Sequence, residues 1–313
     1  AVEAVNARPR GGAAPGASEV LSELRASSSQ IAPADLVSLG MARVDPGEVE
    51  DLAGLLHAEP WVREVLSGAR SALWWRRLAA ARTLSQIACE RDRSDILALI
   101  ADNHPGVQSA ATACLERYAD AELLMSVIDG LAEASSAVRT YQIRILRSHP
   151  VLVASMLIGR IRADAPPHRL YAYIHAAAEL QDARCMKNVA DLSTHPHPEV
   201  RVAVARVLRS SSGDLAHVKL LALLRDPDWR VRAQAARGLA GVTDSRTIDE
   251  LARALADPNW WVRFRAGLAL AATGEKGRTA LTRMLAQSDR YARDMAMLVI
   301  GLSDASVTEL SEG

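Results

Sequence analysis

Two stretches of this sequence, Asp226-Pro-Asp-Trp-Arg-Val-Arg232 and Asp257-Pro-Asn-Trp-Trp-Val-Arg263, align without gaps, and His195-Pro-His-Pro-Glu-Val-Arg201 aligns with both. Their valines, Val200, Val231 and Val262, are 31 residues apart. Steps of similar length from these valines reach five further anchor positions, which are Arg76, Val107, Val138, His168 and Ala292. A fixed period of this length is typical of repeat proteins, so the sequence predicts eight repeats.

Each repeat carries an apolar pattern of helical period. Four residues after the anchors stand mostly alanines, and eight residues after them mostly leucines. Offsets of zero, four and eight lie on one face of an α-helix, which predicts one buried stripe per repeat. Seven residues before most anchors, an apolar residue such as Leu224 or Leu255 marks the end of a preceding helix. We therefore expect a pair of antiparallel helices in each repeat, with alanines that let neighbouring helices approach closely.

The start of each second helix has its own signal, three residues before the anchor. The residues there are Leu73, His104, Ser135, Ala165, His197, Asp228, Asn259 and Asp289. Most of these side chains can accept a hydrogen bond from a free amide of the first helical turn, so we expect this position to be the N-cap. Pro105, Pro166 and Pro198 follow it at the first helical position, where a missing amide costs nothing.

This pattern resembles the HEAT repeat family, in particular the short bacterial kind with the signature D-P-x-x-x-V-R-x-x-A-x-x-x-L, and it is also similar to the repeats of phycobilin lyases. The match is closest at Asp226 to Leu239 and Asp257 to Leu270 and extends over about residues 60 to 302. The resemblance implies an all-α fold, a right-handed α-solenoid (armadillo-like superhelix) of about eight HEAT-like helix pairs. In such a fold the first helices lie on the convex side and the second helices line the concave side.

The beginning of the chain differs from the repeats in composition. Residues 1–45 are rich in Ala, Gly, Pro and Ser, and we expect them to form a flexible N-terminal tail with one short helical candidate from Glu19 to Arg25. Residues 46–313 are then the solenoid. We expect the tail to be a tether, with the hypothesis that a segment before Ala1 joined the domain to a membrane anchor or another module.

The apolar runs and the cysteines indicate in which cellular compartment the protein is found. The longest apolar run, Val151 to Gly159, is far below the roughly 20 residues that a membrane helix needs. Cys89, Cys114 and Cys185 stand far apart and form no CxxC pair, so we expect buried, reduced thiols instead of disulfides or a zinc site. These features favour a soluble protein in the cytoplasm, either free or on the cytoplasmic face of a membrane, and the resemblance to short bacterial HEAT repeats implies a bacterial source.

No motif for catalysis stands out. The sequence contains no nucleophile elbow, P-loop or dinucleotide-binding glycine pattern, and it lacks the His-Glu dipeptides that carry iron in the hydroxylases built from HEAT repeats. His195 and His197 could share a metal, but they fit better as residues around a helix start. We therefore expect a non-enzymatic protein with no catalytic residue, no cofactor and no metal.

Acidic and basic residues recur with the repeat. Acidic residues five before the anchor (Asp102, Glu133, Asp226 and Asp257) can pair with the arginines that follow the anchors, which are Arg77, Arg139, Arg169, Arg201, Arg232, Arg263 and Arg293. Recurrence favours a structural ladder of Asp–Arg pairs within the repeats over a catalytic site.

The candidate site lies beside the buried stripe, at offsets of minus one, plus three and plus six. Aromatic residues and arginines gather there, and these residue types are enriched in binding hot spots. Lys+Arg and Asp+Glu are equal at 37 each, so attraction must come from such a local surface. We expect a scaffold or adaptor whose groove binds an acidic or extended protein segment. Its predicted partner-binding residues are Trp75, Arg82, Tyr141, Arg144, Tyr171, Arg206, Arg237, Trp261, Arg265 and Tyr291.

Two other functions stay open. HEAT-like DNA glycosylases for alkylated purines use a concave face with Trp, Asp and many basic residues, which tryptophans such as Trp74, Trp229 and Trp260 could imitate. The zero net charge and the dispersed acids argue against nucleic acid as the partner. The likeness to phycobilin lyases suggests a bilin-lyase-like chaperone, although repeat similarity does not transfer chemistry.

Overall fold

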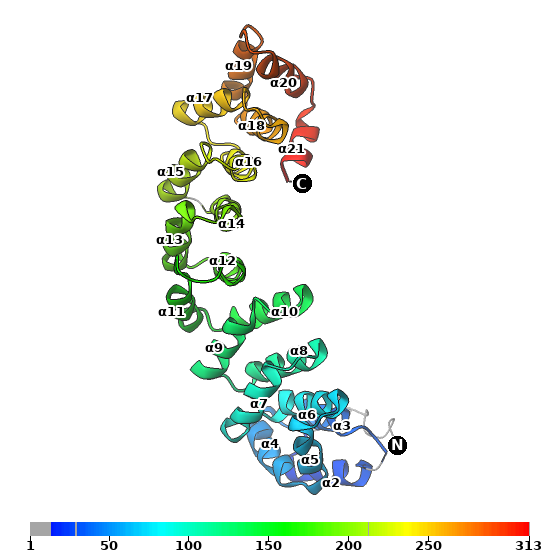
Figure 1. Ribbon diagram of the computed structural model, residues 1–313. Coiled ribbons are helices and arrows are strands. Elements are labelled where there is room, and N and C mark those ends of the chain that lie inside the picture. Colours follow the sequence, from blue (N-terminus) through cyan, green and yellow to red (C-terminus); the bar gives the residue numbers. More distant parts are fainter. Residues whose placement is uncertain (1–13, 29, 212, 313) are drawn as a thin grey trace. The chain divides into compact units, whose positions relative to one another are not determined.

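The computed structural model describes residues 14–28, 30–211 and 213–312, and this part of the chain is helical without any strand. It divides into two compact halves, Ala1–Val153 and Ala154–Gly313, with the boundary inside helix α11 (Pro150–Arg160). The helices follow one another in an all-α solenoid, as Figure 1 shows for each half. The predicted fold class is confirmed.

The helices of the N-terminal half are α2 (Ala17–Ser27), α3 (Pro33–Arg43), α4 (Val49–Ala58), α5 (Pro60–Leu66), α6 (Trp74–Ile87), α7 (Arg93–Ile100), α8 (Pro105–Ala113), α9 (Ala121–Gly130) and α10 (Ser136–Leu146). Short 3₁₀ turns stand between them at η1 (Pro46–Glu48), η2 (Ser67–Arg70), η3 (Glu90–Asp92) and η4 (Cys114–Glu116).

The helices of the C-terminal half are α12 (Pro167–Leu180), α13 (Ala183–Asp191), α14 (Pro198–Leu208), α15 (Asp214–Leu223), α16 (Trp229–Gly238), α17 (Ser245–Ala254), α18 (Trp260–Ala272), α19 (Glu275–Met284), α20 (Arg290–Ile300) and α21 (Asp304–Glu312), with the 3₁₀ turn η5 (Leu192–Thr194) after α13.

The repeat register predicted from the sequence holds. Each anchor lies in the first turn of a different second helix, and these helices are α6, α8, α10, α12, α14, α16, α18 and α20. The residues four after the anchors are all buried, and those eight after are buried except Ile300 in α20. At the anchors themselves, Arg76 and His168 are exposed and the others are buried.

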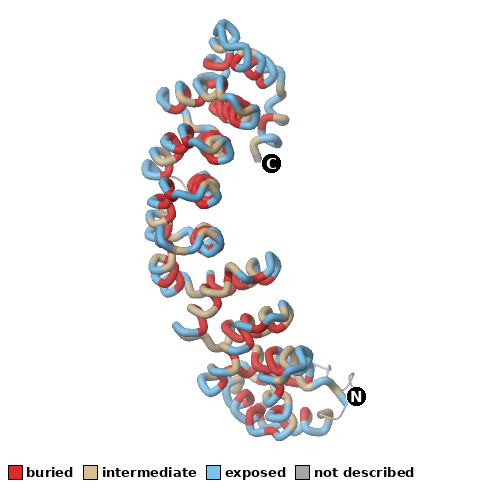
Figure 2. The backbone as a smooth tube through the Cα atoms, viewed as in Figure 1, coloured by how far each residue is buried: buried red, intermediate tan, exposed pale blue. Residues whose placement is uncertain are grey.

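The second helices pack on one another in order. In the C-terminal half, α12, α14, α16, α18 and α20 each contact the next, while α13 contacts α15 and α17 contacts α19. Figure 2 shows the buried residues gathered on the helix sides that face these neighbours. Small residues make the contacts close: a Cβ added at Gly267 of α18 would lie 2.7 Å from Val299 of α20. The stack is therefore built for alanine and glycine at these positions.

Most of the expected N-caps are confirmed. Asp228, Asn259 and Asp289 each accept a hydrogen bond from a first-turn amide of α16, α18 and α20, and Ser135 and His104 do the same for α10 and α8. Leu73 and His197 occupy the cap position without such a bond. The repeat at residue 165 differs, because its N-cap is Pro166 and not Ala165.

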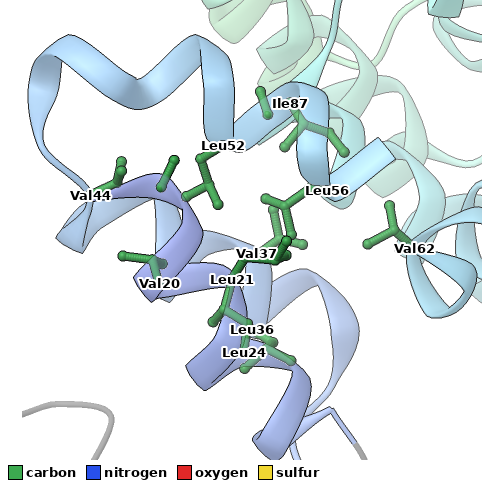
Figure 3. Packing of buried hydrophobic residues seen from close by; sticks show 12 residues of the cluster. Val20, Leu21, Leu24, Leu36, Val37, Val44, Leu52, Leu56, Val62 and Ile87 are labelled. Carbon is green, nitrogen blue, oxygen red and sulfur yellow. The ribbon is translucent and has the colours of Figure 1, made fainter. Parts of the chain in front are cut away.

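The prediction of a flexible tail over residues 1–45 is wrong for residues 17–43, while residues 1–13 lie outside the described part. The expected short helix at Glu19 to Arg25 is the inner portion of α2, and α3 follows it. Val20, Leu24 and Leu36 are fully buried in a core with Leu52 of α4 (Figure 3). Apolar residues three and four apart give both helices a face to bury, and this signal outweighs the flanking Gly, Pro and Ser.

None of the described helices is long and apolar enough to span a bilayer.

Candidate functional site

Recurring Arg–Asp pairs connect consecutive repeats. Arg201 donates from Nε and Nη2 to Asp226 over 2.6 and 2.8 Å, and Arg232 donates to Asp257 over 2.7 and 2.9 Å. Arg77 pairs with Asp102 in the same way. Each arginine also donates from Nη1 to carbonyls at the start of its own second helix, such as His195 O and Pro196 O for Arg201. The ladder is confirmed, but it runs between repeats and not within them.

Two arginines at the same position of their repeats make other contacts. Arg139 donates to three backbone carbonyls, those of Leu131, Ala132 and Ala134. Arg263 keeps its carbonyl contacts and lies over the ring of Tyr291, 4.6 Å from its centroid. These contacts hold Arg139 to the loop before its own helix and join Arg263 to α20.

The predicted site residues of the N-terminal half are solvent-accessible. Trp75 and Arg82 are exposed on α6, and Trp75 meets Trp74 edge-on. On α10, the guanidinium of Arg144 lies over the ring of Tyr141, 4.6 Å from its centroid, and also reaches Glu116. The structure thus places two small groups here, one on α6 and one on α10.

The predicted aromatic residues of the C-terminal half are also exposed. Tyr171 on α12, Trp261 on α18 and Tyr291 on α20 are 43%, 50% and 57% exposed. Trp261 meets Trp260 edge-on at 5.0 Å, and Trp260 stacks on Phe264 at 4.8 Å. An exposed aromatic group therefore surrounds the start of α18.

The predicted arginines of the C-terminal half come together. Arg206 on α14, Arg237 on α16 and Arg265 on α18 are joined by Arg209, the residue directly after α14, and we call these four residues the arginine cluster. Burial, followed by repulsion from the other three arginines, lowers the pKa of Arg237. Burial and then Arg209 lower the pKa of Arg265. Arg206 and Arg209 are exposed, whereas Arg237 and Arg265 are half-buried.

The last helix of the chain touches this cluster. Helix α21 packs against α18, as Figure 1 shows. Arg265 Nη1 donates to Leu310 O over 2.6 Å, and Arg237 Nε donates to Ser311 O over 2.9 Å. Carbonyls at the C-terminal end of a helix carry the negative end of its dipole, which favours a cation there. The cluster therefore already contacts one polypeptide segment.

One group of side chains in the described residues has the composition of a metal site. His57 Nε2, Cys89 Sγ and an oxygen of Asp92 lie within 4.8 Å of one another. His57 Nδ1 contacts Ala53 O at 2.9 Å and Nε2 contacts Asp92 Oδ2 at 3.0 Å. The hydrogen bond to Asp92 raises the pKa of His57 against the opposing effect of burial. A hydrogen-bonded His–Asp pair that links α4 to η3 accounts for these contacts.

The histidines singled out in the sequence have a structural role. His195 is buried, its Nε2 contacts Ala163 O at 3.2 Å, and its Nδ1 accepts from His197 N at 3.2 Å. His195 therefore connects neighbouring loops at the start of α14.

The thiols are free, and Cys114 and Cys185 are buried. Burial raises the pKa of Cys114 to about 12 and that of Cys185 to about 11. A cavity of about 430 Å³ lies among α12 to α15 with Met186, Val207 and Leu215 in its wall, and Lys187 is the charged residue of its described lining. The wall offers no acid–base pair for catalysis among these residues.

Comparison with known proteins gives the class of the fold. Residues 217–301 match the family model for HEAT repeats, so the expected resemblance is confirmed for this segment of the solenoid. No curated protein matches the sequence.

Two solved structures are similar to the chain. An engineered protein from the Northeast Structural Genomics Consortium has a TM-score of 0.39 and 15% identity, over 94% of this chain and 97% of that chain. Human deoxyhypusine hydroxylase in complex with glycerol has a TM-score of 0.33 and 18% identity, over 82% of this chain and 99% of that chain.

Sequence reasoning missed one member of the arginine cluster. Arg209 stands nine residues after the anchor Val200, outside the offsets that select the helix face. It is the C-cap residue of α14, and its backbone keeps the right-handed helical conformation and donates to Ala205 O. The sequence signal that could have found it is the basic residue at the end of a helix, where the dipole favours a cation.

Proposed function

We propose that this protein is a non-enzymatic interaction scaffold that binds an acidic, extended segment of a partner protein through the arginine cluster. One observation carries the proposal: Arg206, Arg237 and Arg265 lie on three consecutive second helices with Arg209 directly after the first of them, and Arg237 is close enough to be repelled by the other three. An added carboxylate relieves this repulsion and forms charge-assisted hydrogen bonds, which are about twice as strong as neutral ones. The location we propose is the bacterial cytoplasm, either free or at the face of a membrane.

A polypeptide is favoured over nucleic acid for two reasons. Helix α21 is a polypeptide segment, and its carbonyls at Leu310 and Ser311 accept from this cluster. Many other arginines are paired with carboxylates, as Arg230 is with Asp228 and Glu199, so a long duplex would find few free cations.

The aromatic residues are proposed as the apolar part of the interface. Trp261 and Tyr291 are large, exposed and held by their neighbours, so they lose little conformational freedom on binding. Tyr171 is proposed as a further contact on the same half of the chain. Trp75, Arg82, Tyr141 and Arg144 stay predicted contacts in the N-terminal half.

Binding of a labelled acidic peptide tests the proposal. The probe is a fluorescein-labelled Glu-Ala repeat peptide with a free C-terminal carboxylate, and its affinity for the full chain is measured by fluorescence polarisation. Replacing both exposed arginines in Arg206→Gln/Arg209→Gln should weaken binding about tenfold, which corresponds to about 1.4 kcal/mol. Raising the salt concentration should weaken binding to the unmodified chain, because the contacts are ionic.

The control is Arg246→Gln, which removes one exposed charge from α17 outside the arginine cluster and should leave peptide affinity unchanged. A labelled DNA duplex is titrated in parallel. Equal affinity of the double variant and the unmodified chain for the peptide contradicts the proposal. Tighter binding of the duplex, with a steep dependence on salt, would assign the cluster to nucleic acid instead.

A further inference from the structure

Helix α21 departs from the order of the stack. Among the earlier first helices of the C-terminal half, α13 contacts α15 and α17 contacts α19. Helix α21 follows the second helix α20 and so stands in the place of the next first helix, yet it packs against the second helix α18. It therefore lies on the row that carries the arginine cluster and not on the row of first helices.

The C-terminal end of α21 contacts the arginine cluster through its backbone. Two consecutive carbonyls, Leu310 O and Ser311 O, accept from Arg265 and Arg237 over 2.6 and 2.9 Å. Carbonyls of the last helical turn have no partner within the helix, so outside donors can satisfy them. These two arginines are the half-buried members of the cluster, and the exposed Arg206 and Arg209 extend beyond the contact.

The rest of α21 is held weakly. Val307 is its one well-buried apolar residue, at 6% exposure, whereas Leu310 is 38% exposed. At the other end Asp304 forms an exposed ion pair with Arg278 of α19, a type of contact that contributes little. A helix of nine residues is marginal by itself in water. Elements with few buried contacts are those that open most easily.

We infer that α21 is an internal ligand of the arginine cluster: it covers Arg237 and Arg265 until the acidic segment of a partner displaces it. This inference rests on the proposed function and names its regulation. The carboxylates of an acidic segment can reach Arg206 and Arg209, which are exposed, as well as the two arginines that α21 covers.

Competition between α21 and the partner for the arginine cluster has a quantitative consequence. The apparent affinity of the partner is its intrinsic affinity multiplied by the fraction of molecules in which α21 has left the cluster. Loosening α21 therefore tightens binding of the partner without any change in the binding surface.

The test uses the full chain with Val307→Asp, which places a charge where α21 is buried. Thr308→Asp is the matched control, since it adds the same charge at an exposed position of the same helix. The acidic Glu-Ala peptide described above should bind Val307→Asp on the order of tenfold more tightly than the unmodified chain, and Thr308→Asp should match the unmodified chain. A labelled peptide of residues 304–313 should bind Val307→Asp in trans and lose binding in Val307→Asp/Arg237→Gln.

Hydrogen exchange on the unmodified chain gives a second readout that does not depend on the fold of a variant. Adding the acidic peptide should speed the exchange of amides in residues 304–312. If the peptide binds the unmodified chain and Val307→Asp equally and exchange of α21 does not change, the internal ligand is refuted while the proposed function stands. If the peptide binds neither chain, the proposed function fails and the inference fails with it.

Discussion

The ladder between repeats gives a stability prediction that can be worked from its contacts. Asp226 accepts two hydrogen bonds from Arg201, at 2.6 and 2.8 Å, and one from Asp228 N at 2.9 Å. Both Arg201 and Asp226 are 9% exposed, so Asp226→Ala leaves a buried guanidinium without its carboxylate. Breaking a buried pair in this way costs about 3–5 kcal/mol. Since Arg201 keeps its two carbonyl acceptors, we expect the lower end, about 3 kcal/mol.

Urea unfolding followed by circular dichroism measures this loss. The control is Asp164→Ala, which removes the exposed partner of Arg162 and should cost less than about 1 kcal/mol. The double replacement Arg201→Met/Asp226→Leu should recover much of the lost stability, because it removes both charges. Equal midpoints for Asp226→Ala and Asp164→Ala would refute the role of the ladder as a link between repeats.

Two further predictions concern single positions. His57→Gln removes the bond to Asp92 that raises the pKa of His57 above 6.5. The stabilisation from this bond is complete below pH 6.5 and is lost as pH rises through the folded pKa. The unfolding midpoint of the unmodified chain should therefore fall as pH rises above 6.5, and that of His57→Gln should fall less. Equal slopes would contradict this. The lowered pKa of Asp92, where bonds from His57 and Cys89 N overcome burial, has the opposite sign: its contribution is present above pH 3.8 and is lost as pH falls through the folded value. Gly277→Ala places a Cβ 1.8 Å from the backbone oxygen of Leu270 and should cost about 1–3 kcal/mol in urea unfolding, whereas Gly54→Ala, with no atom within 4 Å, should cost nothing.

The repeat could be predicted from the sequence because stacking imposes the same packing on every repeat. A Val, Ala and Leu stripe at offsets of zero, four and eight is buried in nearly every second helix, so the pattern survives even where the signature is weak. At Gln142 the pattern has a polar residue, and that side chain is still buried at 1% exposure. At this position the place in the stack, and not the residue type, decides burial, whereas the polar anchors Arg76 and His168 are exposed.

The remaining features depend on contacts between segments that no local pattern encodes. The partner of Arg201 is Asp226, 25 residues ahead. The sequence offers acids at a fixed offset in four of the eight repeats without saying which repeat supplies the bond. Helices α2 and α3 lack the repeat, so their composition suggested a tail although Val20 and Leu36 are buried. The return of α21 to α18 could not be predicted, because the contacts described for it include backbone carbonyls, those of Leu310 and Ser311, which leave no pattern in the sequence.

The central claim is that the arginine cluster recognises carboxylates. The most direct test compares the affinity of the full chain for the Glu-Ala peptide with its affinity for the matched Gln-Ala peptide. The two peptides are similar in size and hydrogen-bonding capacity and differ in charge. We predict that the Glu-Ala peptide binds at least about tenfold more tightly at low salt, and that Arg206→Gln/Arg209→Gln shrinks this difference. Equal affinity for the two peptides would contradict the claim.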